Sequence, residues 1–222
     1  MNITVSQNFQ ILKNCSKLST TLMSKRKSSK DDNVQEKKVK FNHWSLGLLE
    51  TLNDPKNLVQ EDSYTHVIKD KFPKATYHYL VISKQDISSI SKVTNDDVDL
   101  LRHMEKVAKK IVQDVNNSDS TYQFKIGYHA QPSMARLHLH VISDDMISPC
   151  LKTKKHWNSF TTDFFIPSED IVKSLVNDGQ FSLPSDQQCK NYLTQCLKCN
   201  KCDYVPKHLG DLKKHILGHL KT

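Results

Sequence analysis

Three histidines near the middle of the chain could share one chemical task. His138 and His140 are separated by a single residue, and His129 lies shortly before them, just ahead of a Gln-Pro turn. Alternate side chains of a strand project from the same face. We therefore expect His138 and His140 to point together, with the leucines beside them filling the core. The turn could fold His129 back over the same face, so the three imidazoles can meet.

Three interpretations of this cluster compete. The histidines could simply occupy a half-exposed strand, without any chemistry. They could hold a metal, because a His-x-His pair on a strand is a known ligand arrangement. The sequence, however, shows no carboxylate or third histidine in an obvious position to complete such a site. Nucleophilic catalysis fits better, since a neutral imidazole attacks phosphorus well and the resulting phosphoramidate is readily hydrolysed. A predicted basic loop follows and could neutralise phosphate charge; it contains Lys152, Lys154, Lys155 and His156.

A second motif, near the C-terminus, predicts a zinc site. Its spacing is Cys199-x2-Cys202-x12-His215-x3-His219. Two thiolates on a tight turn and two imidazoles one helical turn apart can converge on one tetrahedral Zn²⁺ ion. We expect a structural zinc finger of the Cys2His2, ββα-like type, with Leu209, Leu212 and Ile216 packed under its helix.

Other assignments of this motif are weaker. The four residues could be grouped by chance, or Cys196 could pair with Cys199, but the gap to His215 would then be fifteen residues rather than twelve. Cys189 and His208 are interpreted as bystanders. A single finger contacts only about three base pairs. We therefore expect Lys207, Lys213 and Lys214 to hold DNA through its phosphates, while a protein-binding finger is the alternative.

The charge distribution also favours a nucleic-acid partner. The chain has 222 residues, and 32 Lys and Arg outnumber 24 Asp and Glu, for a net charge of +8. Residues 1–40 carry nine basic and three acidic residues, and residues 196–222 carry six and two, so the body between them is slightly acidic. Basic ends of this kind bind phosphates by releasing counterions, although they could serve only solubility.

Residues 1–40 are predicted to be a disordered basic arm. No apolar run is long enough to span a bilayer, so we expect a soluble protein, and no secretory signal is visible. Two basic clusters at residues 25–27 and 37–40 resemble a nuclear import signal. A mitochondrial transit peptide is the alternative, because residues 1–30 contain no acid.

The elements that must position these motifs indicate an α+β fold. Strands are predicted at Tyr64–Lys69, Ala75–Ser83, Thr121–Tyr128 and Arg136–Ser143 from their β-branched and aromatic residues. Helical spacing of apolar residues predicts helices over residues 44–52, from Asn95 to Val115 after an N-cap at Thr94, and from an N-cap at Ser168 to Asn177 with Gly179 as the stop.

The string His138-Leu-His140-Val, with the strand and helix before it, resembles the histidine-triad (HIT) superfamily of nucleotide hydrolases and transferases. Within that superfamily, further strings resemble the aprataxin family over residues 42–220: His43-Trp44-Ser, Asp70-Lys-Phe-Pro-Lys74-Ala, Gly127-Tyr-His129-Ala, Pro132-Ser133-Met134 and the run Ser148–Phe160. The resemblance implies a HIT-type antiparallel sheet with packed helices at residues 41–180, followed by a linker and the finger at residues 181–222.

The resemblance also implies a function: a DNA-repair hydrolase that removes AMP from 5′-adenylated DNA ends left by abortive ligation. His138 would be the nucleophile, His140 would position the phosphate, and His129 would protonate the departing DNA 5′-phosphate. Substrate would be held by Ser133, Lys152, His78 and Lys74, with Trp44 stacked on the terminal base. No catalytic metal is implied. The expected partners are nicked or adenylated DNA, RNA–DNA junctions among them, and AMP, bound by a monomer.

Two departures from the family pattern stand out. Arg136 replaces the first histidine of the triad, which puts the orientation of His138 in doubt, and residues 1–40 are too short for the phosphopeptide-binding domain that some aprataxins carry at the N-terminus. Two rival functions therefore stay open. One is a general HIT nucleotide phosphoramidase or hydrolase, and the other is a non-catalytic zinc-finger adaptor that binds DNA.

Overall fold

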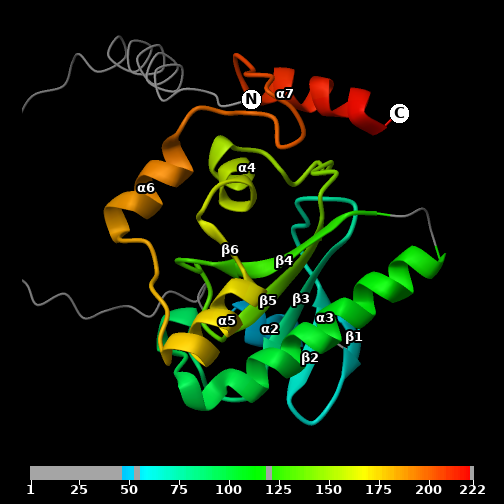
Figure 1. Cartoon of the computed structure of the whole chain (residues 1–222). Helices are drawn as coiled ribbons and strands as arrows, with labels where there is room; N and C mark the ends of the chain where they lie inside the picture. Colours follow the sequence, from blue (N-terminus) through cyan, green and yellow to red (C-terminus); the bar gives the residue numbers. More distant parts are fainter. Residues whose placement is uncertain (1–46, 53–55, 119–121, 221–222) are drawn as a thin grey trace, which may run out of the picture. The chain divides into compact units, whose positions relative to one another are not determined.

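The computed structural model describes residues 47–52, 56–118 and 122–220, and all of them belong to one compact unit that begins at Asn42 (Figure 1). The predicted N-terminal arm and Trp44 lie outside the described residues. None of the described helices is long and apolar enough to cross a membrane.

An antiparallel sheet of six strands forms the centre of the unit, as the α+β prediction requires. The strand order is β1-β2-β3-β5-β4-β6. The strands are β1 (Leu58–Glu61), β2 (Thr65–Lys69), β3 (His78–Ser83), β4 (Phe124–His129), β5 (His138–Ser143) and β6 (Phe165–Pro167). The four predicted strands are confirmed with shorter N-terminal ends. Two were not predicted: the edge strand β1 and the three-residue β6.

One face of the sheet is covered by helices α3 (Val98–Ser118) and α5 (Ser168–Asp178) (Figure 1). The predicted apolar stripe of α3 packs on Leu139 and Val141 of β5 in the largest core cluster. Thr94 forms the expected capping box with Asp97, but a short 3-10 turn, η3 (Asn95–Asp97), precedes the helix proper. The helix α5 ends at Gly179 with a φ of 69°, as predicted, whereas its N-cap is Pro167 rather than Ser168.

The opposite face carries the histidines. Its coverage comes from α2 (Gly47–Leu52) on one side and α4 (Lys154–Thr161) on the other. The predicted basic loop around residues 150–160 is therefore wrong in part, because residues 154–161 are helical. Thr153 caps this helix by accepting a hydrogen bond from the His156 amide, and Trp157 and Phe160 are buried beneath it.

The C-terminal region adds two helices, α6 (Asp186–Thr194) and α7 (Leu209–Ile216), and the short turn η4 (Leu217–Leu220). No strand is assigned over residues 195–208, all of which are described, so the finger lacks the expected hairpin strands. A turn closed by the Cys199 amide and the Tyr204 carbonyl (2.9 Å) takes their place. Cys189 is buried against Phe164, and His208 caps α7, so both are structural, as expected.

Candidate active site and zinc centre

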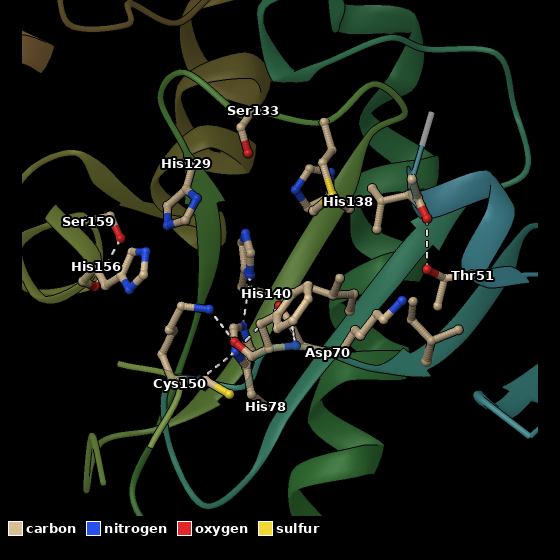
Figure 2. Close-up of a pocket in the computed structure, with 18 of the residues that line it drawn as sticks. Thr51, Asp70, His78, His129, Ser133, His138, His140, Cys150, His156 and Ser159 are labelled. Atoms are coloured by element: carbon tan, nitrogen blue, oxygen red, sulfur yellow. Dashed lines mark hydrogen bonds and ion pairs between the residues drawn. The ribbon is translucent and has the colours of Figure 1, made fainter. Parts of the chain in front are cut away.

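A cavity of about 830 Å³ opens on the histidine face between α2 and α4 (Figure 2). We call it the histidine pocket. Its floor is formed by His78 of β3, His129 of β4, and His138 and His140 of β5. The pairing of β3 and β4 with β5 brings together histidines that are far apart in the sequence.

The three predicted imidazoles do meet. The ring of His140 lies in the middle, with centroids 4.4 Å from His129 and 5.1 Å from His138. His138 and His140 are buried with 5% and 4% of their surface exposed. The strand is therefore buried rather than half-exposed, and each buried imidazole nitrogen needs a hydrogen-bond partner.

The hydrogen bond of His138 sets its tautomer. Its Nδ1 lies 2.8 Å from the backbone carbonyl oxygen of Arg136. A carbonyl can only accept, so Nδ1 carries the proton and Nε2 holds a lone pair. Figure 2 shows this ring among the residues that line the histidine pocket. The ring is therefore in the form that a nucleophile needs.

A second chain of hydrogen bonds sets the tautomer of His140. The backbone N–H of Lys74 donates to Nδ1 of His78 (3.2 Å), which leaves the proton of His78 on Nε2. That nitrogen lies 3.0 Å from Nδ1 of His140. His140 must then accept at Nδ1 and carry its own proton on Nε2, which is buried and has no partner among the described residues. The structure thus presents an N–H donor suited to a phosphoryl oxygen.

All four imidazoles of the pocket floor have lowered pKa values. Burial lowers the pKa of His78 to about 4, partly offset by the charge of Asp70. Burial and the charges of neighbouring histidines and Lys74 lower the pKa of His129 to about 3. The pKa values of His138 and His140 also lie below the ordinary value, mainly because of burial. The rings are therefore neutral at physiological pH.

An aromatic wall explains this burial. Phe160 of α4 lies 4.6 Å from the ring of His129 and 5.3 Å from those of His78 and His140. Phe165 of β6 contacts His129 from another side. Gly127 makes room for β6, because a Cβ there would lie 2.3 Å from the carbonyl oxygen of Ile166.

Only some of the residues predicted to bind substrate or DNA line the histidine pocket. Lys74, Ser133, Lys152 and His156 line the histidine pocket. Lys154 and Lys155 do not; they lie exposed in the first turn of α4. In the finger, Lys207 and Lys214 are exposed, whereas Lys213 donates one hydrogen bond to the carbonyl of Ser148 (3.0 Å) and so also joins the finger to the catalytic region.

The sequence did not identify the apolar side of the pocket. Leu48 of α2, Ile68 of β2 and Leu80 of β3 form one cluster there and line the cavity. A signal was available in β3, where Leu80 lies two residues after His78 and therefore on the same face of the strand. Such a surface suits the flat, apolar face of a nucleobase.

A carboxylate does lie beside the histidines, contrary to the sequence interpretation. Asp70 has an oxygen 3.6 Å from Nδ1 of His78, and Asp70, His78 and His140 could offer clustered ligand atoms. The facing nitrogens of His78 and His140 are already hydrogen-bonded to each other, however, and the charge of Lys74 acts on the same rings. These features suit an anion better than a metal cation.

The predicted zinc ligands converge. Sγ of Cys199 and Cys202 and Nε2 of His215 and His219 all lie within 4.8 Å of one another. Specific separations are 3.1 Å between Cys202 and His215, 3.5 Å between Cys199 and His219, and 3.1 Å between the two histidines. Tetrahedral Zn²⁺ with bonds of about 2.0 to 2.3 Å requires ligand atoms roughly 3.3 to 3.8 Å apart. The donor set therefore fits a structural Zn²⁺ ion.

Comparison with known proteins agrees with both regions. The family model described as "Scavenger mRNA decapping enzyme C-term binding" matches residues 43–156, and the C2HE / C2H2 / C2HC zinc-binding finger model matches residues 161–222. Aprataxin of Gallus gallus is 42% identical over 88% of this chain, and aprataxin of Danio rerio is 44% identical over 84%. The chain spans only 61% and 57% of the length of these two relatives.

A shorter relative is covered almost completely. The aprataxin-like protein of Saccharomyces cerevisiae is 31% identical over 72% of this chain and 88% of its own length. The crystal structure of the aprataxin ortholog Hnt3 from Schizosaccharomyces pombe, 23% identical, has the same fold, with a TM-score of 0.63 over 78% of this chain and 89% of that one. The chain combines the histidine-triad fold and its buried imidazoles with a C-terminal zinc finger. It belongs to the aprataxin family.

Proposed function

We propose that this protein is a nuclear DNA-repair hydrolase that releases AMP from 5′-adenylated DNA. The observation that carries the proposal is the pair of fixed tautomers in the histidine pocket. His138 presents a lone pair at Nε2, and His140 presents an N–H at Nε2. These two forms support a nucleophile at His138 and a phosphoryl-oxygen donor at His140, two residues apart on β5.

The reaction follows in two displacements. Nε2 of His138 forms a bond to the phosphorus of AMP while the bond from that phosphorus to the oxygen of the DNA 5′-phosphate breaks. His140 donates to a phosphoryl oxygen, and Lys152 and Ser133 lie where they can hold other oxygens. Water then attacks the adenylyl-histidine, the P–N bond breaks with its electrons returning to Nε2, and AMP leaves.

His129 is proposed as the acid for the departing DNA phosphate. One of its nitrogens hydrogen-bonds the backbone of Ser159, and its Nε2 is buried without a partner among the described residues. Its pKa of about 3 keeps the ring neutral in the free protein. Anionic phosphates beside the ring favour its charged form and raise this pKa, so substrate binding itself would supply the proton-donating form.

DNA is the proposed macromolecular substrate. A structure of the ortholog Hnt3 has been determined in complex with DNA. In this chain the exposed lysines 152, 154, 155, 207 and 214 lie on α4, the segment before it, and the finger, which share one apolar cluster. We propose that these lysines bind phosphates of nicked or adenylated DNA, with Trp44 stacked on the end base. The proposed reaction uses no catalytic metal, because the lysines offset the phosphate charge and the imidazole N–H groups donate hydrogen bonds to phosphate oxygens.

Trapping the intermediate tests this proposal directly. Wild-type protein is mixed with DNA whose 5′-adenylate carries labelled phosphorus, quenched, and assayed for label on the protein, and turnover is compared with and without Mg²⁺. We expect an adduct and AMP release from the wild type and from His103→Ala, a control on α3 whose ring pairs with Asp62. His138→Ala should give neither.

Equal labelling of His138→Ala would show that another group is the nucleophile. Faster turnover of free adenosine phosphoramidate than of adenylated DNA would favour the general nucleotide hydrolase. Absence of both adduct and turnover in the wild type would leave the non-catalytic DNA-binding adaptor.

A further inference from the structure

The backbone just before the nucleophile is strained. Arg136 has a φ of 89°, a region that residues with side chains rarely adopt. Such conformations persist only where the surroundings hold them, and they concentrate at functional sites. Arg136 stands where the triad pattern has its first histidine, two residues before His138.

Hydrogen bonds hold this strained segment against the chain between β3 and η2 (Ile90–Lys92). The amide of Arg136 donates to the carbonyl of Ser88 (2.9 Å), and the amide of Leu137 donates to that of Ile87 (2.7 Å). The carbonyl of Arg136 consequently faces Nδ1 of His138 at 2.8 Å. The unusual φ is therefore linked to the bond that sets the tautomer of the nucleophile.

The side chain of Arg136 fastens the same segment. Its Nη1 donates to the carbonyl of Gln85 (2.8 Å) and lies 3.1 Å from a carboxylate oxygen of Asp86. The arginine side chain is 18% exposed, whereas that of Asp86 is 95% exposed. The ion pair is thus well solvated and weak, and the bond to the carbonyl is the firmer anchor. Arg136 is not among the described residues that line the histidine pocket.

We propose that Arg136 is a positioning residue, whose guanidinium clamps residues 85–86 so that its strained backbone presents a carbonyl to Nδ1 of His138. This inference rests on the proposed function of His138 as the nucleophile. Because Arg136 does not line the histidine pocket, its proposed effect is exerted through that ring. Both contacts are made by one nitrogen, Nη1, held at the end of a rigid planar guanidinium, whereas a lysine carries its ammonium on a flexible four-carbon stem. An arginine at this position is thus compatible with a working triad and need not mark an inactive one.

Two variants and a control test the clamp. Arg136→Gly removes the side chain and relieves the φ strain, so it should fold. Arg136→Lys keeps the charge but replaces the rigid guanidinium with a flexible ammonium. Arg102→Ala removes an exposed arginine on α3 and is the matched control. The tautomer of His138 is read from ring ¹⁵N shifts of the free protein at neutral pH, and kcat and KM are measured on adenylated DNA.

For Arg136→Gly we expect both tautomers of His138 and a fall in kcat of about tenfold with KM nearly unchanged, because misorientation of a reacting group lowers kcat. Arg136→Lys should recover part of the loss, and Arg102→Ala should match the wild type. A folded Arg136→Gly with a single Nδ1–H tautomer and a kcat within about twofold of wild type would overturn the proposal. Failure of the wild type to turn over DNA would refute the proposed function instead, while the tautomer comparison would still decide the role of Arg136.

Discussion

At the scale of single residues, the main feature is a set of imidazoles kept neutral by burial. Phe160 and Phe165 shield the rings of His129 and His140 from water, and His138 is buried beside His140. The pKa of His138 is lowered from its ordinary value of 6.5, chiefly by this desolvation. A nucleophile must be unprotonated, so burial favours the neutral form that the role proposed for His138 requires.

This leads to a prediction about pH. Because the pKa of His138 is lowered, its neutral form persists as pH falls below 6.5. We expect kcat/KM, which reports groups of the free enzyme, to show no acid limb due to His138 until the pH is below 6.5. The measurement is kcat/KM from about pH 8 to about pH 5, the interval around an ordinary imidazole, with circular dichroism to verify folding. An acid limb centred at or above pH 6.5 would contradict the prediction if it arises from His138. A limb that disappears when another titrating group is substituted arises from that group and would agree with the prediction.

At the scale of elements, the close approach of β6 to β4 shapes the pocket wall. β6 holds Phe165 over the histidines, and it pairs with β4 opposite Gly127. An added Cβ at Gly127 would lie 2.7 Å from the Phe165 ring as well as against the backbone of Ile166. The backbone of Ile166 cannot move aside as a flexible side chain can, so the packing of β6 against β4 requires glycine at position 127.

We therefore predict that Gly127→Ala destabilises the protein by about 1 to 3 kcal/mol, as overpacking does elsewhere. Urea unfolding measures the change. Gly47→Ala is the control for stability, because a Cβ at Gly47 in α2 meets nothing within 4 Å. If Gly127→Ala proved as stable as wild type, β6 would have to shift freely, and its role as a fixed wall would be wrong.

The sequence predicted the helices and strands whose apolar residues recur at a regular spacing. The helical stripe of α3 follows from the burial of one face, and the period-two pattern of β5 comes from histidines alternating with apolar residues in a strand buried on both faces, so both were predictable. The short β6 and the edge strand β1 bury too few side chains to show a period. Helix α4 begins with Lys154 and Lys155, whose charge suggested a loop, although Trp157 and Phe160 already had helical spacing.

The site was predictable to a similar degree. His138 and His140 share a face because of local strand geometry, which any two-residue period reveals. The bond between His78 and His140 depends on the register that pairs β3 with β5, and sequence separation hides such a contact. The assignment of catalytic and DNA-binding roles to individual residues stays a prediction, as do the domain boundaries at residues 40 and 180.

At the scale of the whole unit, the finger and the catalytic region share a core. Leu197, Leu212 and Ile216 pack with Trp157 and Phe160 in one apolar cluster. Polar bonds add to it: Asn158 donates to the carbonyls of Leu193 and Gln195, and Lys201 pairs with Asp144. Helix α4, which forms one wall of the histidine pocket, therefore packs against the zinc finger.

Loss of zinc should consequently affect catalysis as well as DNA binding. We predict that Cys202→Ser lowers kcat even on free adenosine phosphoramidate, because α4 loses its support, and lowers the free energy of unfolding by several kcal/mol. Turnover and urea unfolding of proteins prepared in the presence of Zn²⁺ measure both effects, with Asp203→Asn, an exposed change in the same turn, as control. Unchanged turnover of the small substrate by Cys202→Ser would indicate that the finger is energetically separate.

The indole of Trp157 sits at this junction, fully buried, with its N–H bonded to the carbonyl of Lys198 (3.0 Å). The chain has only two tryptophans. Replacing Trp44 by phenylalanine would leave Trp157 as the sole tryptophan. The fluorescence emission of Trp157 would then shift to the red if water entered the contact between α4 and the finger. The molecule thus contains an intrinsic optical reporter for the docking of its finger, readable in real time as metal is withdrawn or nucleic acid is added.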